Sequence, residues 1–261
     1  MAYISPALTA ITNTVKKASV PLTRDFNELE RLQSSVRNDG MFAVRSYEKV
    51  ERILKEELAK IRPSYPIICK KSDVVPMKGN YFAVSPIDGF PNFAHGNGNF
   101  AISVAMIENS NIVDAVIYNP IFDELFFAEK GCGAFKEGFR NHERLRVSGC
   151  KNIEKALISC NADTEVITKA LTLSPNVIIK GAISLDLAYV AGGKSDVVIS
   201  SNSTTCNIAA GMLLVKEAGG YILEIGNKDV RSEDLIKVLL NGEIIATNES
   251  LRQKIADVMA K

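Results

Sequence analysis

Short apolar runs occupy the region from residue 66 to residue 129, and they constrain the fold more than any other feature of the chain. The runs are separated by Gly, Asn and Pro, residue types that interrupt strands and form turns. The clearest runs are residues 66–69, 100–107, 112–118 and 124–129. This pattern is typical of strands joined by short connections, so we expect a mostly antiparallel sheet.

The segments before this region have the pattern of helices. Between residues 47 and 61, apolar side chains recur at three- and four-residue intervals, and charged residues occupy the other face. The apolar positions are Val50, Ile53, Leu54, Leu58 and Ile61. Pro63 is expected to end this helix. An earlier helical segment runs through residues 26–33 to a polar break at residues 34–40.

The second half alternates strand-like and helical segments, which predicts α/β layering. Residues 177–180 and 196–199 are strand-like, whereas residues 185–191 and 208–218 are helical in pattern. Glycine-containing breaks before residues 145–148 mark a junction between the halves. We therefore expect an N-terminal α+β part, residues 1–140, and a C-terminal α/β part, residues 141–261, within one compact unit.

Composition excludes several classes of function. A chain of 261 residues with 46% hydrophobic content can bury a large core without disulfides or a structural metal. Its 31 basic and 30 acidic residues nearly cancel, so no overall charge favours nucleic acid or an acidic membrane surface. No stretch approaches the ~20 apolar residues of a membrane span. The five cysteines form no C-x-x-C pair and the start has no signal-peptide pattern, so we expect a cytoplasmic protein.

The sequence S-P-I-D-G-F-P-N-F at residues 85–93 follows an apolar run and resembles the D-P-I-D-G-T-x-N-F signature of the inositol monophosphatase family. In that signature, two acidic side chains, a backbone carbonyl and a threonine hydroxyl gather Mg²⁺ ions and a water. Here Ser85 replaces the first aspartate and Phe90 replaces the threonine. Ser85 brings no charge, and Phe90 can neither donate nor accept a proton. Two-metal chemistry depends on closely spaced carboxylates, so these replacements weaken it.

The resemblance covers almost the whole chain and is strongest to the bacterial extragenic-suppressor branch of the family. The separated motifs that carry it lie at residues 24–33, 119–135, 185–193 and 209–220. It implies a layered αβαβα sandwich of the inositol monophosphatase (sugar phosphatase) type, with the site between the N-terminal and C-terminal parts. The resemblance also implies a homodimer.

Other positions that the resemblance assigns to the metal site also carry a different residue type. The family's paired glutamates fall on Lys70 and Lys71, which reverses their charge. The aspartate of the W-D-x-A-A-G motif falls on Asn207, and Tyr47 stands where the family has a further acid. Because Ser85 and Phe90 are altered as well, the changes concentrate at the site and are not spread along the chain.

Asp88 is the only expected metal-binding acid that remains, together with the Ile87 carbonyl. A Lys70 ammonium ~4 Å from a divalent ion would be repelled by roughly 8 kcal/mol at an effective dielectric of about 20. A millimolar Mg²⁺ site is worth only about 4 kcal/mol. We therefore expect no metal pair and no resident cofactor, and Mg²⁺ would be the cofactor only if hydrolysis survives.

Several of these residues could bind an anion instead. The D-G-F turn at residues 88–90 resembles the family's phosphate-binding turn, and a helix beginning near Asn207 would direct N–H groups toward it. Lys70 and Lys71 could then replace the metal charge. The further candidate phosphate contacts are Ser184 and Ser200. Asp88 and Asn207 could equally act only as local backbone caps.

The replaced residues also have purely structural interpretations. Lys70 and Lys71 could lie at a solvated strand end or pair with Asp88 in the space that a metal would otherwise fill. Phe90 and Tyr47 suit side chains that fill a closed cleft, because aromatic residues gain most by burying area.

Three functional hypotheses follow. In the first, the chain keeps the family fold, has lost hydrolysis, and acts through binding or a regulatory interaction; the resemblance implies a partner in the transcription machinery. In the second, it remains a Mg²⁺-dependent phosphatase for inositol phosphate or a similar phosphomonoester, using Asp88. In the third, Lys70, Lys71 and the Gly89 turn bind a phosphorylated metabolite without metal.

Overall fold

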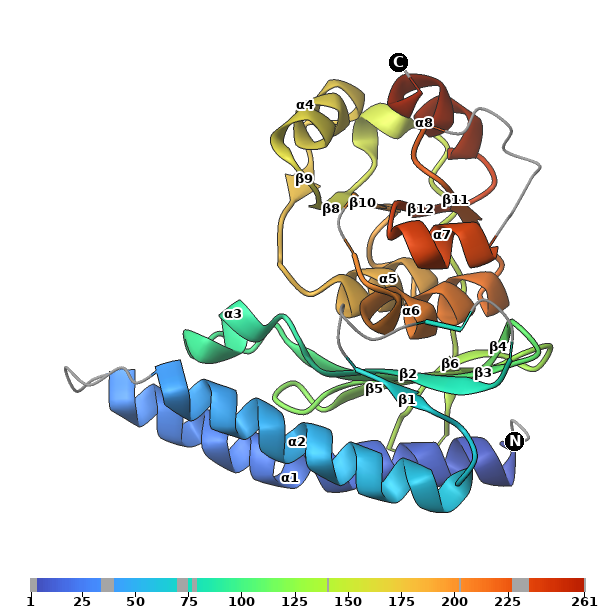
Figure 1. The fold of residues 1–261 in the computed structure, drawn as a ribbon. Coiled ribbons are helices and arrows are strands. Elements are labelled where there is room, and N and C mark those ends of the chain that lie inside the picture. The colour runs from blue at the N-terminus through green and yellow to red at the C-terminus, as the bar shows by residue number, and fades with distance from the viewer. Residues whose placement is uncertain are drawn as a thin grey trace.

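The computed structural model describes residues 4–33, 40–69, 75–76, 79–139, 141–201, 203–226 and 235–260. Layers of helix and sheet alternate through the molecule (Figure 1). A helical pair covers one face of the first sheet, further helices lie between the two sheets, and a last helical layer covers the second sheet. No helix in the described ranges is long and apolar enough to cross a membrane.

The N-terminal layer consists of α1 (Pro6–Gln33) and α2 (Gly40–Ile61). α2 begins earlier than the apolar pattern from residue 47 indicates, because its first turns bury Ala43 and Ser46 against the neighbouring elements. It ends before Pro63, as predicted. The apolar faces of both helices pack on the first sheet in one core cluster.

The first sheet has seven strands in sequence order. They are β1 (Ile67–Ile68), β2 (Tyr81–Asp88), β3 (Ala101–Glu108), β4 (Asn111–Asn119), β5 (Glu124–Glu129), β6 (Gly133–Lys136) and β7 (Glu143–Arg144). Every neighbouring pair is antiparallel except β1 with β2. The mostly antiparallel sheet predicted from the apolar runs is therefore confirmed, and β5 has the predicted bounds.

Strand β2 is buried along its whole length because helices cover both faces of its sheet. Successive side chains point to opposite faces. Phe82 and Val84 accordingly join the core beneath α1 and α2, whereas Tyr81 and Ala83 join the core on the other face. The strand passes an irregularity in its pairing with β3 and ends at Asp88. A short helix, α3 (Phe90–Ala94), follows the turn.

The second sheet has five strands in the order β11-β12-β10-β8-β9. They are β8 (Ile158–Asn161), β9 (Val177–Ile178), β10 (Val197–Ser200), β11 (Tyr221–Leu223) and β12 (Ile244–Thr247). The helices of this half are η1 (Ile153–Lys155), α4 (Thr164–Leu173), α5 (Ile183–Ala191), α6 (Thr205–Glu217), α7 (Leu235–Asn241) and α8 (Arg252–Met259). The predicted α/β layering of this half is thus observed. Residues 145–148, where we expected the junction between the halves, form no strand.

Helices α5 and α6 lie between the two sheets (Figure 1). Nearly all of their residues are buried, as expected for helices covered on every side. Gly211 allows the two helices to approach closely, because a Cβ at this position would lie 2.5 Å from Leu187 Cβ. Their first turns point toward the end of β2, and this junction contains the candidate site.

Candidate functional site

Asp88, at the end of β2, is 3% exposed and accepts hydrogen bonds from both helices of the middle layer. Ser184, in the first turn of α5, donates its backbone N–H at 2.7 Å and its Oγ–H at 2.6 Å to Asp88 Oδ2. Asn207, in the first turn of α6, donates from Nδ2 to Asp88 Oδ1 at 2.9 Å. Asp88 therefore ties the first sheet to α5 and α6, and both of its oxygens are engaged by donors.

Burial raises the pKa of Asp88 to about 6, and hydrogen bonds from Ser184 and the Gly89 backbone partly oppose this rise. The carboxylate also supplies an acceptor at the start of α5, where Ala182 occupies the N-cap and has no side-chain acceptor to offer. Asp88 thus caps a helix that is distant in sequence. The structural interpretation offered from the sequence was a cap of the local backbone.

The amide of Asn207 is held from two sides. Thr204 Oγ donates to Asn207 Oδ1 at 3.0 Å, which leaves Nδ2 directed at Asp88. The structure therefore brings together Asn207 and Asp88, which the family resemblance assigned to one site. In place of a second carboxylate, Asn207 presents a hydrogen-bond donor.

The turn after Asp88 requires glycine. Gly89 has φ +81°, and a Cβ there would lie 2.7 Å from the Asn99 carbonyl oxygen. Asn92 then donates through Nδ2 to the carbonyl oxygens of Asn99 and Lys180, both at 2.7 Å. These contacts hold the turn against the segment that leads into α5, so the position of Asp88 relative to Ser184 is fixed.

Tyr47 and Phe90 contact each other edge to face, with ring centroids 5.9 Å apart and an interplanar angle of 83°. Both rings pack against the core beneath α1 and α2, which fits the interpretation of space-filling side chains. Ser85 is buried within β2, opposite Ser103 of β3. Ile87 is also buried in the strand.

The remaining predicted residues contribute little to the described site. Ser200 donates to the Asn161 carbonyl oxygen at 2.7 Å and shares a 2.6 Å hydrogen bond with Ser203 Oγ, so its hydroxyl is used at the carboxyl end of β10. Lys70 and Lys71 lie outside the described residues, so their predicted pairing with Asp88 or with an anion stays a prediction.

Asp186, two residues beyond Ser184 in α5, is a buried acid that the residue-by-residue sequence comparison missed. Its carboxylate is fully buried, and neither oxygen has a hydrogen-bond partner in the described parts of the chain. Lys180 Nζ is 3.7 Å from Oδ1. Burial raises the pKa of Asp186 to about 7; Lys180 opposes the rise, and the charge of Asp88 adds to it. An acid inside the apolar motif at residues 185–193 was the available signal.

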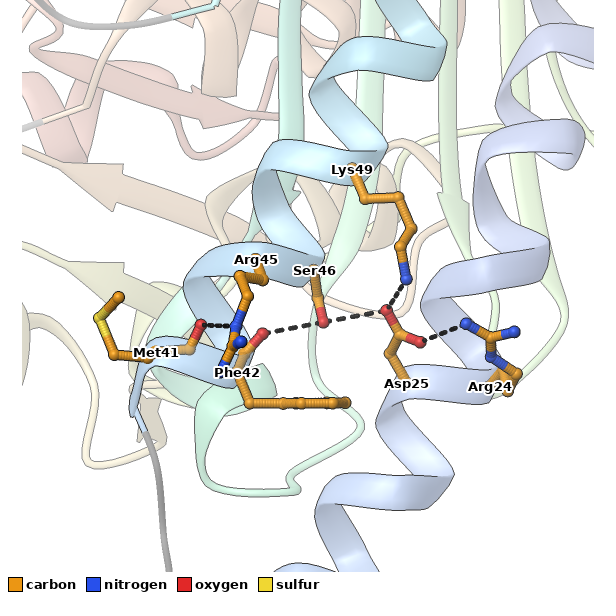
Figure 2. Close-up of polar contacts among 7 residues, drawn as sticks. All are labelled: Arg24, Asp25, Met41, Phe42, Arg45, Ser46 and Lys49. Atoms are coloured by element: carbon orange, nitrogen blue, oxygen red, sulfur yellow. Dashed lines mark hydrogen bonds and ion pairs between the residues drawn. The ribbon is translucent and has the colours of Figure 1, made fainter.

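A second polar cluster joins α1 to α2 (Figure 2). Asp25 Oδ2 accepts from Ser46 Oγ at 3.0 Å and from Lys49 Nζ at 2.9 Å, while Arg24 Nη2 lies 3.3 Å from Oδ1. Asp25 is only 3% exposed, and its partners satisfy the charge. The cluster ties α1 to α2.

The acids near the junction do not gather as metal ligands do. Within the described ranges, no group of three or more His, Cys, Asp or Glu side chains could hold a metal ion. Mg²⁺ requires near-octahedral oxygen ligands. Ser184 and Asn207 instead direct hydrogen atoms at Asp88, and these three bonds use most of the lone pairs of its carboxylate. The residues described here therefore do not fit a two-metal centre.

The model of the inositol monophosphatase family matches residues 5–261. The chain belongs to this family. An inositol-1-monophosphatase of Mesorhizobium japonicum is 34% identical over 271 residues, covering 98% of this chain and 97% of the relative. A protein of Xylella fastidiosa named Nus factor SuhB is 29% identical over 242 residues, covering 88% of this chain and 86% of the relative.

Solved structures show the same fold. The extragenic suppressor protein suhB from Bartonella henselae aligns with a TM-score of 0.84 at 31% identity, covering 98% of this chain and 100% of that chain. An inositol monophosphatase from Anabaena aligns with a TM-score of 0.78 at 23% identity, covering 96% and 94%. The predicted family and layered fold are confirmed.

Proposed function

We propose that this chain is an inositol monophosphatase-family protein that has lost two-metal hydrolysis and acts by binding, as a cytoplasmic homodimer. The observation that carries the proposal is the environment of Asp88, the remaining acid of the metal-loop signature. Ser184 and Asn207 direct three hydrogen-bond donors at its two oxygens, and these bonds use most of the lone pairs that a metal would need. The site thus supports a structural junction better than a hydrolytic centre.

A protein of the transcription machinery is the partner we propose. Several relatives are named Nus factor SuhB, among them the one from Xylella fastidiosa and one from Pseudomonas aeruginosa at 27% identity. The test is capture of purified RNA polymerase and its elongation factors on the immobilised chain. The Mesorhizobium phosphatase is the matched control and should capture less of these proteins. The proposed partner would be contradicted if the present chain captured none of them, or no more than the control does.

Loss of metal binding is tested by calorimetric titration of Mg²⁺ and Mn²⁺. The natural chain is compared with a variant carrying Lys70→Glu, Ser85→Asp and Asn207→Asp, which restores the acids of the family pattern. We expect no binding by the natural chain up to about 10 mM metal, and measurable binding by the variant. Saturable binding by the natural chain would overturn the proposal.

The second candidate is a Mg²⁺-dependent phosphatase that acts on inositol phosphate or a similar phosphomonoester. The specific support is the 34% identity to relatives named inositol-1-monophosphatase. Release of phosphate from inositol 1-phosphate, dependent on Mg²⁺ and lost in an Asp88→Asn variant, would favour this candidate over a binding role.

Metal-free binding of a phosphorylated metabolite is the least supported of the three candidates. The first turn of α5 already donates to Asp88, and the buried Asp186 adds further acidic character nearby. An anion at this junction would meet these acids. Stabilisation of the chain by inorganic phosphate without metal, measured as a rise in the unfolding temperature, would reverse this ranking.

A further inference from the structure

A pocket of about 370 Å³ lies at the other end of β2 and α6 from Asp88. Tyr81, the first residue of β2, and Leu213, in the second half of α6, both line it. Tyr81 and Asp88 are seven steps apart along the strand, a distance of roughly 23 Å at ~3.3 Å per residue. The pocket is therefore separate from the family site, and its volume falls within the range of small-molecule sites.

The walls of the pocket are mainly apolar and come from both parts of the fold. The apolar lining includes Ile107, Ile112, Leu213, Leu235, Leu239 and Leu240. One wall is held in place by Glu217, whose carboxylate accepts from the backbone N–H groups of Gly131 at 2.8 Å and Gly133 at 2.9 Å. These bonds tie the β5–β6 turn to the end of α6, so the cavity is formed before any ligand arrives.

Tyr81 brings a polar group to the lining of this pocket. The residue is 3% exposed and lines the cavity. A tyrosine hydroxyl at an apolar wall can donate a hydrogen bond to an acceptor that enters the cavity. Burial and the nearby Cys206 raise the pKa of Tyr81, so the group remains a donor at neutral pH.

Two lysines and one glutamate line the same pocket. Lys130 and Lys216 line it, and Lys130 Nζ is held by a 2.7 Å hydrogen bond to Asn111 Oδ1. Glu217 is the acid of the lining, and the two backbone N–H groups already satisfy its carboxylate. An anionic group at the rim would be attracted to the lysines.

We propose that this pocket binds a small amphipathic anion. The apolar body of the ligand lies against the leucine wall. An oxygen of its anionic group accepts a hydrogen bond from the Tyr81 hydroxyl. The lysines contribute the charge that selects an anion over a neutral molecule of the same shape. Such a ligand occupies space that the Asp88 site does not share, so inorganic phosphate does not compete with it.

The experiment uses decanoate as the probe, titrated calorimetrically into the full chain, with decanol as the neutral counterpart. Tyr81→Phe removes only the hydroxyl. Leu240→Glu places a like charge in the lining at a residue that is 42% exposed, and Leu171→Glu is the matched control on α4, at a residue that is 52% exposed and does not line the pocket. Thermal unfolding of each variant checks that it is folded.

We expect decanoate to bind in a one-to-one ratio and more tightly than decanol. Loss of one hydrogen bond in Tyr81→Phe should weaken binding about 2- to 10-fold. Leu240→Glu should abolish binding, and Leu171→Glu should leave it unchanged. The proposal is overturned if decanoate fails to bind up to about 1 mM, binds with several copies per chain, or binds equally to the Tyr81→Phe and Leu240→Glu proteins.

Discussion

Replacing Asn207 by aspartate places a second carboxylate against Asp88 and tests how the junction is stabilised. In the natural chain, Asn207 Nδ2 donates to Asp88 Oδ1 at 2.9 Å. The substitution keeps the side-chain shape but exchanges this donor for an acceptor. Two ionised carboxylates at roughly 3 Å would repel each other by about 5.5 kcal/mol at an effective dielectric of about 20.

Retaining one proton between the two carboxylates costs less than this repulsion. Because the pKa of Asp88 is about 6, keeping it protonated costs about 1.4 kcal/mol at pH 7 and about 2.7 kcal/mol at pH 8. The folded pair then shares a proton that both carboxyls lose in the unfolded chain. The pKa of the pair is higher in the folded state, so the stability that it provides is lost as pH rises.

The expected result is a variant close to the natural chain in stability at pH 6 and less stable by about 1.4 kcal/mol for each pH unit up to pH 8. Urea unfolding of both proteins at pH 6, 7 and 8 measures this difference. Asn207→Ala is the control, because it loses the hydrogen bond, worth about 1.5–3 kcal/mol, at every pH. A difference between Asn207→Asp and the natural chain that stays constant from pH 6 to 8 would refute the reasoning.

Three further substitutions test the junction and the polar cluster between α1 and α2. Ser184→Ala removes the 2.6 Å bond from Oγ to Asp88 and should cost about 1.5–3 kcal/mol in urea unfolding at pH 7, with a smaller cost at pH 5, where Asp88 is protonated. Gly211→Ala sets a methyl group 2.5 Å from Leu187 Cβ and should lower the unfolding free energy by about 1–3 kcal/mol; unchanged stability would mean that α5 and α6 can separate freely. Asp25→Ala leaves the partners in Figure 2 unsatisfied and should cost about 1–3 kcal/mol, measured by thermal unfolding against the exposed control Glu165→Ala.

The sequence by itself determined the family and the order of layers. The apolar runs gave β5 its bounds and placed β3 and β4 within a residue or two, because strand period and turn residues are local properties of the chain. The motif at residues 85–93 located Asp88, and the resemblance paired it with Asn207. The sequence also shows that Ser85, Phe90 and Asn207, whose side chains carry no charge, stand at positions that the resemblance assigned to the metal site.

Only the tertiary structure decided which groups surround Asp88. Its partners Ser184 and Asn207 are 96 and 119 residues away along the chain. The sequence pattern does not predict which of these donors bonds to which oxygen of Asp88, because that depends on how β2, α5 and α6 pack. The same holds for the burial that raises the pKa of Asp186 and for the cavity around Tyr81. Desolvation and enclosure arise from atoms that several separate segments bring together, and they exist only once those segments have packed.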